Sequence, residues 1–321
     1  MDGRLPQIDY ASHPAYGGML TPHPDLADEA LQVLRPLIRE MADNESRRVA
    51  QFGYVRGHDS EPGRELATQG YSRLQLGQGT IDRICMAAQP VVDQVRERLM
   101  QTRAAEQPIK YKTALETINA ESCPGLWKAI DDAVRAAGFL AVTGAFFNAP
   151  SAKLHSVGVL VNHPNQDWAN RIYRDIEVDT PPTAGFHIDS NGKCLLKAVL
   201  YLTDVGPEQG PFGMVPGSQL WGEGSQERIY RRAFDRSELI VRSAKKRRLF
   251  LSLPREMQVK AEFGGDMIAG SPEADELLSR EIVATGPRGQ LNLFDPESIH
   301  RGGNVRSGER VVALITTRPM W

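Results

Sequence analysis

The sequence predicts an α+β fold, in which N-terminal helices pack against an antiparallel β-core. Apolar residues recur at helical spacing through much of residues 1–138, whereas residues 139–321 contain short β-branched segments separated by Gly, Pro and Asn. No flexible linker marks the change near residue 139. We therefore expect residues 1–321 to form a single domain, with a mainly helical first part and a β-core as its second part.

Two helices are predicted in the first part before residue 100. One lies within residues 24–41, where Pro36 either kinks the helix or marks its true start. The other begins at Thr80, a candidate N-cap, and carries an apolar stripe that reaches Leu99. Residues 56–80 are rich in glycine and polar side chains, so they are predicted to form a loop.

A third helix is predicted over PGLWKAIDDAVRAAG, with Pro124 in its first turn and Gly138 just past its end. From residue 139 the pattern predicts strands of an antiparallel sandwich or barrel. The predicted strands are FLAVTGAFF (139–147), KLHSVGVLVNH (153–163), RIYRDIEVD (171–179), CLLKAVLYLTDV (194–205), GPFGMVPGSQ (210–219), RGQLNLFD (288–295) and RVVALITT (310–317).

Composition restricts the classes of function. The formal net charge of −2 and a pI of about 6.4 do not indicate a nucleic-acid or anionic-membrane partner. The longest apolar run, AAGFLAVTGAFF, is too short to span a bilayer, and the first residues lack the apolar region of a signal peptide. Cys85, Cys123 and Cys194 lie far apart, which favours reduced thiols and a cytoplasmic location.

Four residues indicate a metal centre with an acidic cosubstrate. His187 and Asp189 stand two apart in FHIDSNG, a spacing that on a strand directs both side chains to one face. His300 ends the segment GQLNLFDPESIH, and Arg310 follows ten residues later. Two His and one carboxylate form the ligand set of non-haem Fe(II) oxygenases, with open positions for a 2-oxo acid and O₂. Arg suits the distal carboxylate of 2-oxoglutarate, and a tight turn would return Arg310 to the neighbourhood of His300.

The segments HID, GPFGMVPGSQLW and IHRGGNVRSGER resemble the phytanoyl-CoA dioxygenase-like family of Fe(II)/2-oxoglutarate-dependent oxygenases. The resemblance covers roughly residues 171–321. It implies a double-stranded β-helix, a cupin-like jelly roll, over residues 139–321, with an insertion at about 222–285. It also implies that His187, Asp189 and His300 bind Fe(II), and that Arg310 binds the cosubstrate 2-oxoglutarate.

Two departures from the family pattern stand in this sequence. PGSQ replaces the usual PGSH, and Gly302 stands where some relatives carry a Ser that contacts 2-oxoglutarate. Asp189 retains the carboxylate that related halogenases lack. The resemblance therefore favours hydroxylation of a small organic molecule by O₂, with release of succinate and CO₂.

Further candidates near the site carry alternatives. Tyr173 could reach 2-oxoglutarate or pack as an ordinary aromatic residue. Lys197 either directs its ammonium outward or binds an anion, as substrate or cosubstrate. The run of Lys245, Lys246, Arg247 and Arg248 is read as a solvated face or as a site for an anionic substrate.

Other functions remain open at this level. A cupin-like module that binds metal or ligand without turnover would retain the His and Asp residues, but it gives Arg310 no task. A minor alternative is demethylation of nucleic acid, which the acidic pI and the lack of interleaved aromatic and basic residues disfavour. The sequence leaves the primary substrate and the oligomeric state undetermined.

Overall fold

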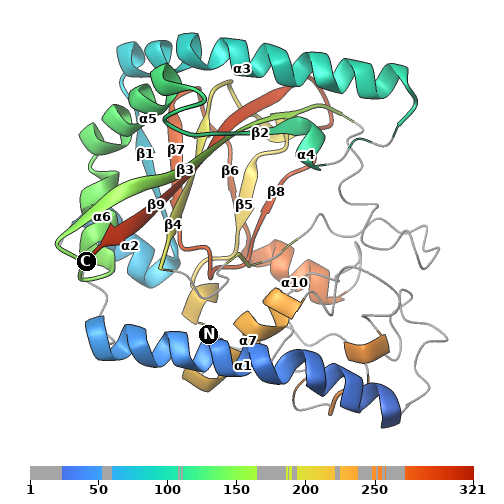
Figure 1. The fold of residues 1–321 in the computed structure, drawn as a ribbon. Coiled ribbons are helices and arrows are strands. Elements are labelled where there is room, and N and C mark those ends of the chain that lie inside the picture. Colours follow the sequence, from blue (N-terminus) through green and yellow to red (C-terminus); the bar gives the residue numbers. More distant parts are fainter. Residues whose placement is uncertain are drawn as a thin grey trace.

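The computed structural model describes residues 24–52, 60–107, 109, 111–164, 186, 188–189, 194–220, 225–237, 248–250, 252–254, 257 and 272–321. A six-stranded antiparallel sheet forms its centre, in the order β1-β7-β4-β9-β3-β2. Its strands are β1 (Tyr71–Gln75), β2 (Leu115–Ile118), β3 (Ser151–Asn162), β4 (Leu196–Tyr201), β7 (Gln290–Phe294) and β9 (Arg310–Met320). Figure 1 shows this sheet beside a smaller one.

The smaller sheet has the order β6-β5-β8, with strands β6 (Ile282–Ala284), β5 (Phe212–Met214) and β8 (His300–Gly302). Tyr201 joins the two sheets from the inner face of β4. Its hydroxyl donates to the carbonyl of Ala284 at 2.6 Å and accepts the N–H of Phe212 at 2.9 Å. The two facing antiparallel sheets, with helices packed outside them, agree with the predicted α+β jelly roll.

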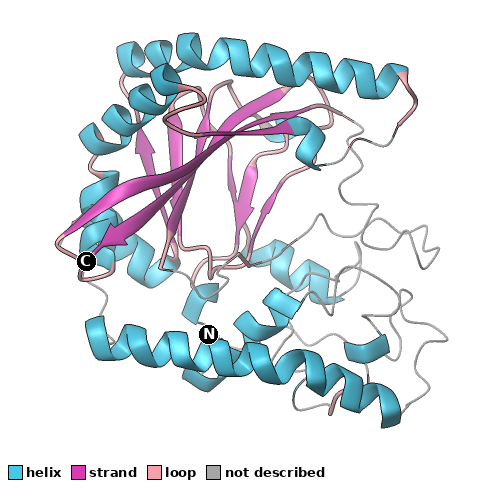
Figure 2. Cartoon of the chain, viewed as in Figure 1, coloured by secondary structure: helices cyan, strands magenta, loops and turns pink. Residues whose placement is uncertain are grey.

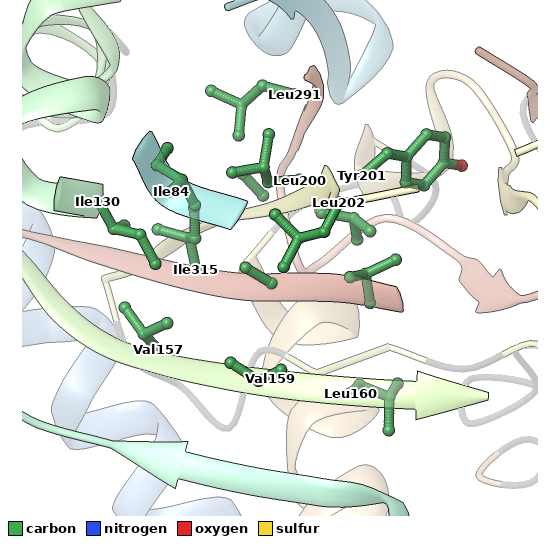
Figure 3. Packing of buried hydrophobic residues seen from close by; sticks show 14 of the residues in the cluster. Ile84, Ile130, Val157, Val159, Leu160, Leu200, Tyr201, Leu202, Leu291 and Ile315 are labelled. Carbon is green, nitrogen blue, oxygen red and sulfur yellow. The ribbon is translucent and has the colours of Figure 1, made fainter. Parts of the chain in front are cut away.

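Helices cover the outer face of the large sheet. They are α2 (Glu61–Gln69), α3 (Gln78–Ala104), α4 (Tyr111–Ala114), α5 (Pro124–Ala136) and α6 (Phe139–Phe146). Ile84 of α3 and Ile130 of α5 are buried with Val157 and Ile315 of the sheet, as Figure 3 shows. This interface removes a continuous apolar surface from water, which is the main contribution to the stability of the fold.

A second helical layer lies at the opposite end of the β-core from α3 (Figure 1; in Figure 2 the helices are cyan). It contains α1 (Pro24–Phe52), α7 (Ser225–Ser237) and α10 (Pro272–Arg280). The 3-10 helices η4 (Pro207–Gln209) and η5 (Ser218–Leu220) lie in the connections on either side of β5. Helices α7 and α10 and strand β6 belong to the predicted insertion at 222–285, so this insertion contributes to both the second layer and the small sheet.

Several predicted elements are corrected. Pro36 lies inside α1, which continues past it to Phe52. The N-cap of α3 is Gly77 rather than Thr80. The prediction of a loop over residues 56–80 is wrong, because α2 and β1 occupy most of it. Ser60 caps α2 by accepting the N–H of Gly63, and β1 is held by its pairing with β7.

The segment 139–147, predicted as a strand, is instead the helix α6. A short run of apolar residues fits a buried helix as well as a buried strand, and its flanks decide between them. Gly138, with φ of +77°, ends α5 as predicted and also starts α6. Phe139 and Phe146 are fully buried against the sheet. The strands predicted at residues 153–163, 194–205, 210–219, 288–295 and 310–317 correspond to β3, β4, β5, β7 and β9.

Candidate metal centre

The segment that carries Asp189 is held by the loop that leads to His300. The backbone N–H of Asp189 donates to the carbonyl of Pro296 at 2.8 Å. Phe186 and Ile188, on either side of His187, are both buried. The guanidinium of Arg301 lies 4.6 Å from the centre of the Phe186 ring, a cation–π contact. Packing and one backbone hydrogen bond therefore fix Asp189 beside the start of β8.

The loop of residues 295–299 is anchored to distant parts of the chain. Asp295 donates its N–H to the carbonyl of Gly70 at 2.9 Å, and Ile299 donates to the hydroxyl of Ser218 at 2.7 Å. Gly70 must be glycine, because its φ is +74° and a Cβ there would lie 2.1 Å from the hydroxyl of Ser298. Ser218 belongs to the PGSQ motif, so that motif supports the loop rather than contacting a metal.

His300 presents one defined nitrogen to Asp189. Its Nδ1 lies 2.8 Å from the carbonyl of Ser298, which can only accept, so Nδ1 carries a proton. In the neutral ring, Nε2 then keeps its lone pair. That nitrogen lies 3.3 Å from Oδ2 of Asp189. Two lone pairs that face each other at this distance suit a shared cation, and imidazole plus carboxylate is a donor set that Fe(II) accepts.

Lys197 supplies a positive charge at the same place. Its ammonium donates to Oδ2 of Asp189 at 2.6 Å, and the side chain is about one quarter exposed. Lys197 therefore points inward to the candidate site, which excludes the alternative that it reaches outward to solvent.

Aromatic rings surround His300, which is buried. The ring centres of Phe294 and Phe212 lie 4.7 Å and 6.0 Å from that of the imidazole. They form an apolar wall beside the imidazole, which is about 4% exposed. Such a wall lowers the local dielectric constant and strengthens electrostatic interactions at the site.

Arg310 is buried at the start of β9. Its guanidinium donates to Oδ1 of Asn162 on β3 from Nε at 3.3 Å and from Nη2 at 2.8 Å. Asn162 carries no charge, so this contact orients the guanidinium without neutralising it. A Cβ at Gly302 would lie 3.4 Å from Nη2 of Arg310. The side chain thus reaches the small sheet two residues beyond His300.

Arg310 lies near β8, as predicted, but the predicted hairpin that would bring it there is not formed. β8 pairs with β5, and β9 pairs with β3 and β4, so the two strands belong to different sheets and form no hairpin. Glu309 receives two hydrogen bonds from Arg96 of α3, at 3.0 Å and 2.6 Å, which fix the start of β9. Gly302 has no side chain to separate Arg310 from β8, which permits the close approach of the two sheets.

Two predicted residues cannot be placed. His187 and Tyr173 both lie outside the described residues, as do Lys245, Lys246 and Arg247 of the basic run. Within the described part of the chain, no three His, Cys, Asp or Glu side chains gather into a metal-binding group. The described site thus brings together Asp189 and His300, and the prediction of His187 as third ligand stays a prediction.

Tyr201 was not predicted, although it stands on the inward face of β4 with Lys197. Burial raises the pKa of its phenol to about 12. The phenol therefore stays protonated at neutral pH and acts as a hydrogen-bond donor between the sheets. The available signal was the spacing along the strand. Lys197, Val199 and Tyr201 stand two residues apart, so their side chains lie on the same face.

Comparison with known families gives one match. Residues 183–312 match the family described as phytanoyl-CoA dioxygenase. This range includes the segment FHIDSNG, the PGSQ motif, His300 and Arg310. No curated protein matches the chain. Among the described residues, no helix is long and apolar enough to cross a membrane.

Solved structures with a related arrangement include the α-ketoglutarate-dependent carbocyclase SnoK from nogalamycin biosynthesis. It is 15% identical, with a TM-score of 0.46, over 81% of this chain and 83% of that one. EctD from S. alaskensis, solved with 2-oxoglutarate and 5-hydroxyectoine, is 14% identical, with a TM-score of 0.47, over 81% and 76%. At this distance, neither likeness identifies a substrate.

Proposed function

We propose that this chain is an Fe(II)- and 2-oxoglutarate-dependent dioxygenase, because residues 183–312 match the phytanoyl-CoA dioxygenase family. We also propose its site residues. His187, Asp189 and His300 hold the iron, and Arg310 binds the distal carboxylate of 2-oxoglutarate. Tyr173 is proposed as a further contact to the cosubstrate. The substrate is a small organic molecule, and the product is its hydroxylated form.

The observation that carries this proposal is the meeting of Asp189 and His300. They come from positions 111 apart in sequence, and Oδ2 and Nε2 face each other at 3.3 Å. The proton of His300 is held on the opposite nitrogen by Ser298. This arrangement keeps Nε2 available as a metal ligand, in the way that outer hydrogen bonds orient metal-binding histidines.

Bound Fe(II) would supply positions for the 2-oxo acid and O₂ and the oxidising power to attack a C–H bond. The chain's own residues orient the metal ligands and the cosubstrate and keep water away from them. Ser298 fixes the tautomer of His300, and Phe212 and Phe294 exclude water from its side of the site. Arg310 holds the far end of the cosubstrate, and Asn162 fixes the plane of its guanidinium. Such fixed positions lower the entropic cost of bringing the reactants together.

We also propose that residues 1–321 form one domain. Buried residues of α2, α3, α5 and α6 share one hydrophobic cluster with the strands of the large sheet, which supports this. Cys85, Cys123 and Cys194 form no disulfide in the described part of the chain. We further propose a reduced cytoplasmic setting and no nucleic-acid partner.

The test is anaerobic addition of Fe(II) and then 2-oxoglutarate to the metal-free protein, followed by visible absorption. We expect a weak charge-transfer band. Arg310→Ala should raise the 2-oxoglutarate concentration needed for half of the band by about ten- to a hundredfold, since a hydrogen bond to a charged group contributes about 1.5–3 kcal/mol. Pyruvate, which lacks the distal carboxylate, serves as the control, because its affinity should be equal in both proteins.

Two outcomes would count against the proposal. If iron binds and no band forms with 2-oxoglutarate, the alternative of a cupin-like binding module without turnover is favoured. If Arg310→Ala weakens pyruvate as much as 2-oxoglutarate, Arg310 acts on the whole site rather than on the distal carboxylate.

A further inference from the structure

A buried ion cluster connects three segments that are far apart in the sequence. Arg232 of α7 donates from Nη1 to Oε2 of Glu45 on α1 at 2.9 Å, and from Nη2 to Glu297. The side chains of Arg232 and Glu45 are more than nine-tenths buried, and that of Glu297 is mostly buried. Buried charges are costly, so such a cluster needs both good geometry and a structural reason.

Glu297 belongs to the loop of residues 295–299, so the cluster directly contacts the loop that orients Asp189 and His300. Its neighbour Pro296 accepts the N–H of Asp189, and its other neighbour Ser298 accepts from Nδ1 of His300. Glu297 also donates its own N–H to the carboxylate of Asp295 at 3.0 Å. The carbonyl before Glu297 therefore orients Asp189, and the carbonyl after it orients His300.

The other anchors of the loop come from the β-core side. Gly70 and Ser218 hold Asp295 and Ile299, the two ends of the loop. Arg232 holds its middle, from a helix of the second layer. Without Arg232, the carboxylate of Glu297 would be left without this cation in a mostly buried position, and it would tend to move toward water. Such a movement would displace the carbonyls of Pro296 and Ser298.

We propose that Arg232 is a positioning residue of the metal centre, which acts through Glu297 on the backbone that orients Asp189 and His300. This role rests on the proposed function of those two residues as metal ligands. Glu45 is the second anchor of Arg232. The long N-terminal helix α1, which lies outside the segment that matches the family, is thereby connected to the site.

The test measures Co(II) binding to the full-length metal-free protein by visible absorption, which reports both affinity and ligand geometry. Arg232→Met should weaken Co(II) binding about tenfold or more, as losses of outer hydrogen-bonding groups do. The matched control is Arg98→Met. Arg98 likewise pairs with a carboxylate, that of Glu116, and donates to the carbonyls of Thr113 and Leu115, but it lies on α3 at the outer face. That variant should lose thermal stability and keep its Co(II) affinity.

A second variant separates positioning from folding. Arg232→Met alone removes one cation from two mostly buried carboxylates and can unfold the protein. The triple variant Glu45→Gln, Arg232→Met, Glu297→Gln removes the charges of these three residues together, and such neutral replacements often preserve folding. We expect it to fold and still to bind Co(II) about tenfold more weakly or worse.

The outcomes are distinguishable. If the wild-type protein binds Co(II) and both the single and the triple variants bind it equally well, the role of Arg232 is overturned while the proposed site stands. Equal weakening in Arg232→Met and Arg98→Met would also overturn it, because the effect would then be one of general stability. Failure of the wild-type protein to bind Co(II) would overturn the proposed function, and with it the role of Arg232.

Discussion

The two faces of the six-stranded sheet have opposite chemistry. On the outer face, Val157, Val159, Leu200, Leu291 and Ile315 pack against helices. On the inner face, every charged side chain that the described strand pairing places there is basic, namely Arg73, Lys153, Lys197, Arg310 and Arg318. Residues that alternate along one strand thus differ in chemistry, apolar packing on one side and positive charge on the other.

This contrast separates substitutions into two classes. A change on the outer face should lower stability and leave ligand affinity unaltered. A change of a basic residue on the inner face, or of His300 on the small sheet that it faces, should alter ligand affinity or turnover more than stability. The same strand, β9, supplies the sharpest pair, because Arg310 points inward and Ile315 points outward.

The largest effect is expected for His300→Ala. Removal of a metal ligand should reduce 2-oxoglutarate-dependent succinate release by about a thousandfold or more, because a metal ion contributes several kcal/mol to the transition state. His300→Ala should nevertheless keep a cooperative thermal transition. Full activity in this variant would show that the site is assigned wrongly.

Ile315→Ala should have the largest effect on stability. Its side chain is about 1% exposed and lies among Ile84, Ile130 and Val157, as Figure 3 shows. The cavity should cost about 2–5 kcal/mol in the free energy of unfolding, measured by urea denaturation. The charge-transfer band with 2-oxoglutarate should form at the wild-type concentration. A folded variant without the band would remove the distinction between the faces.

Tyr201→Phe should have a smaller effect that depends on pH. Loss of the two hydrogen bonds to Ala284 and Phe212 should cost about 1–3 kcal/mol at neutral pH. Burial raises the pKa of this phenol from 10.0 to about 12, so the folded state keeps the proton that the unfolded state releases. The contribution of the protonated phenol is present below pH 10.0 and is lost as pH rises toward about 12.

Denaturant unfolding across that pH range tests this directly. The wild-type free energy of unfolding should fall with a slope that Tyr201→Phe lacks. Parallel slopes in the two proteins would mean that other groups control the alkaline behaviour, and that Tyr201 does not bridge the sheets in solution.

Much of the fold was predictable because its signals are local. The stripe from Ile81 to Leu99 has helical spacing, and the short β-branched segments at residues 194–205 and 310–317 predict β4 and β9. The helix α6 was missed because FLAVTGAFF is apolar throughout, so its spacing does not distinguish a buried helix from a buried strand. β1 was missed because its few residues become a strand only through pairing with β7, from far along the chain.

In the candidate site, too, local patterns could be predicted and contacts between distant segments could not. His300, Asp189 and Arg310 could be predicted because the chemistry restricts residue types and spacing. The loop anchors Gly70, Ser218 and Arg232 could not, since a hydrogen bond between segments far apart in the chain leaves no local sequence pattern. The direction of Lys197 was also undetermined until the place of β4 in the sheet was known.

The position of β9 has a consequence for the order in which the protein can assemble during synthesis. The strands β1, β7 and β4 form one group and β2 and β3 another, and β9 is the strand that pairs with both. A nascent chain that has emerged only to residue 309 can therefore form two separate partial sheets with unpaired edges, on which aggregation can start. Arg310, the proposed cosubstrate anchor, enters with the strand that joins them. The chain can thus place this proposed anchor only in the step that completes its central sheet.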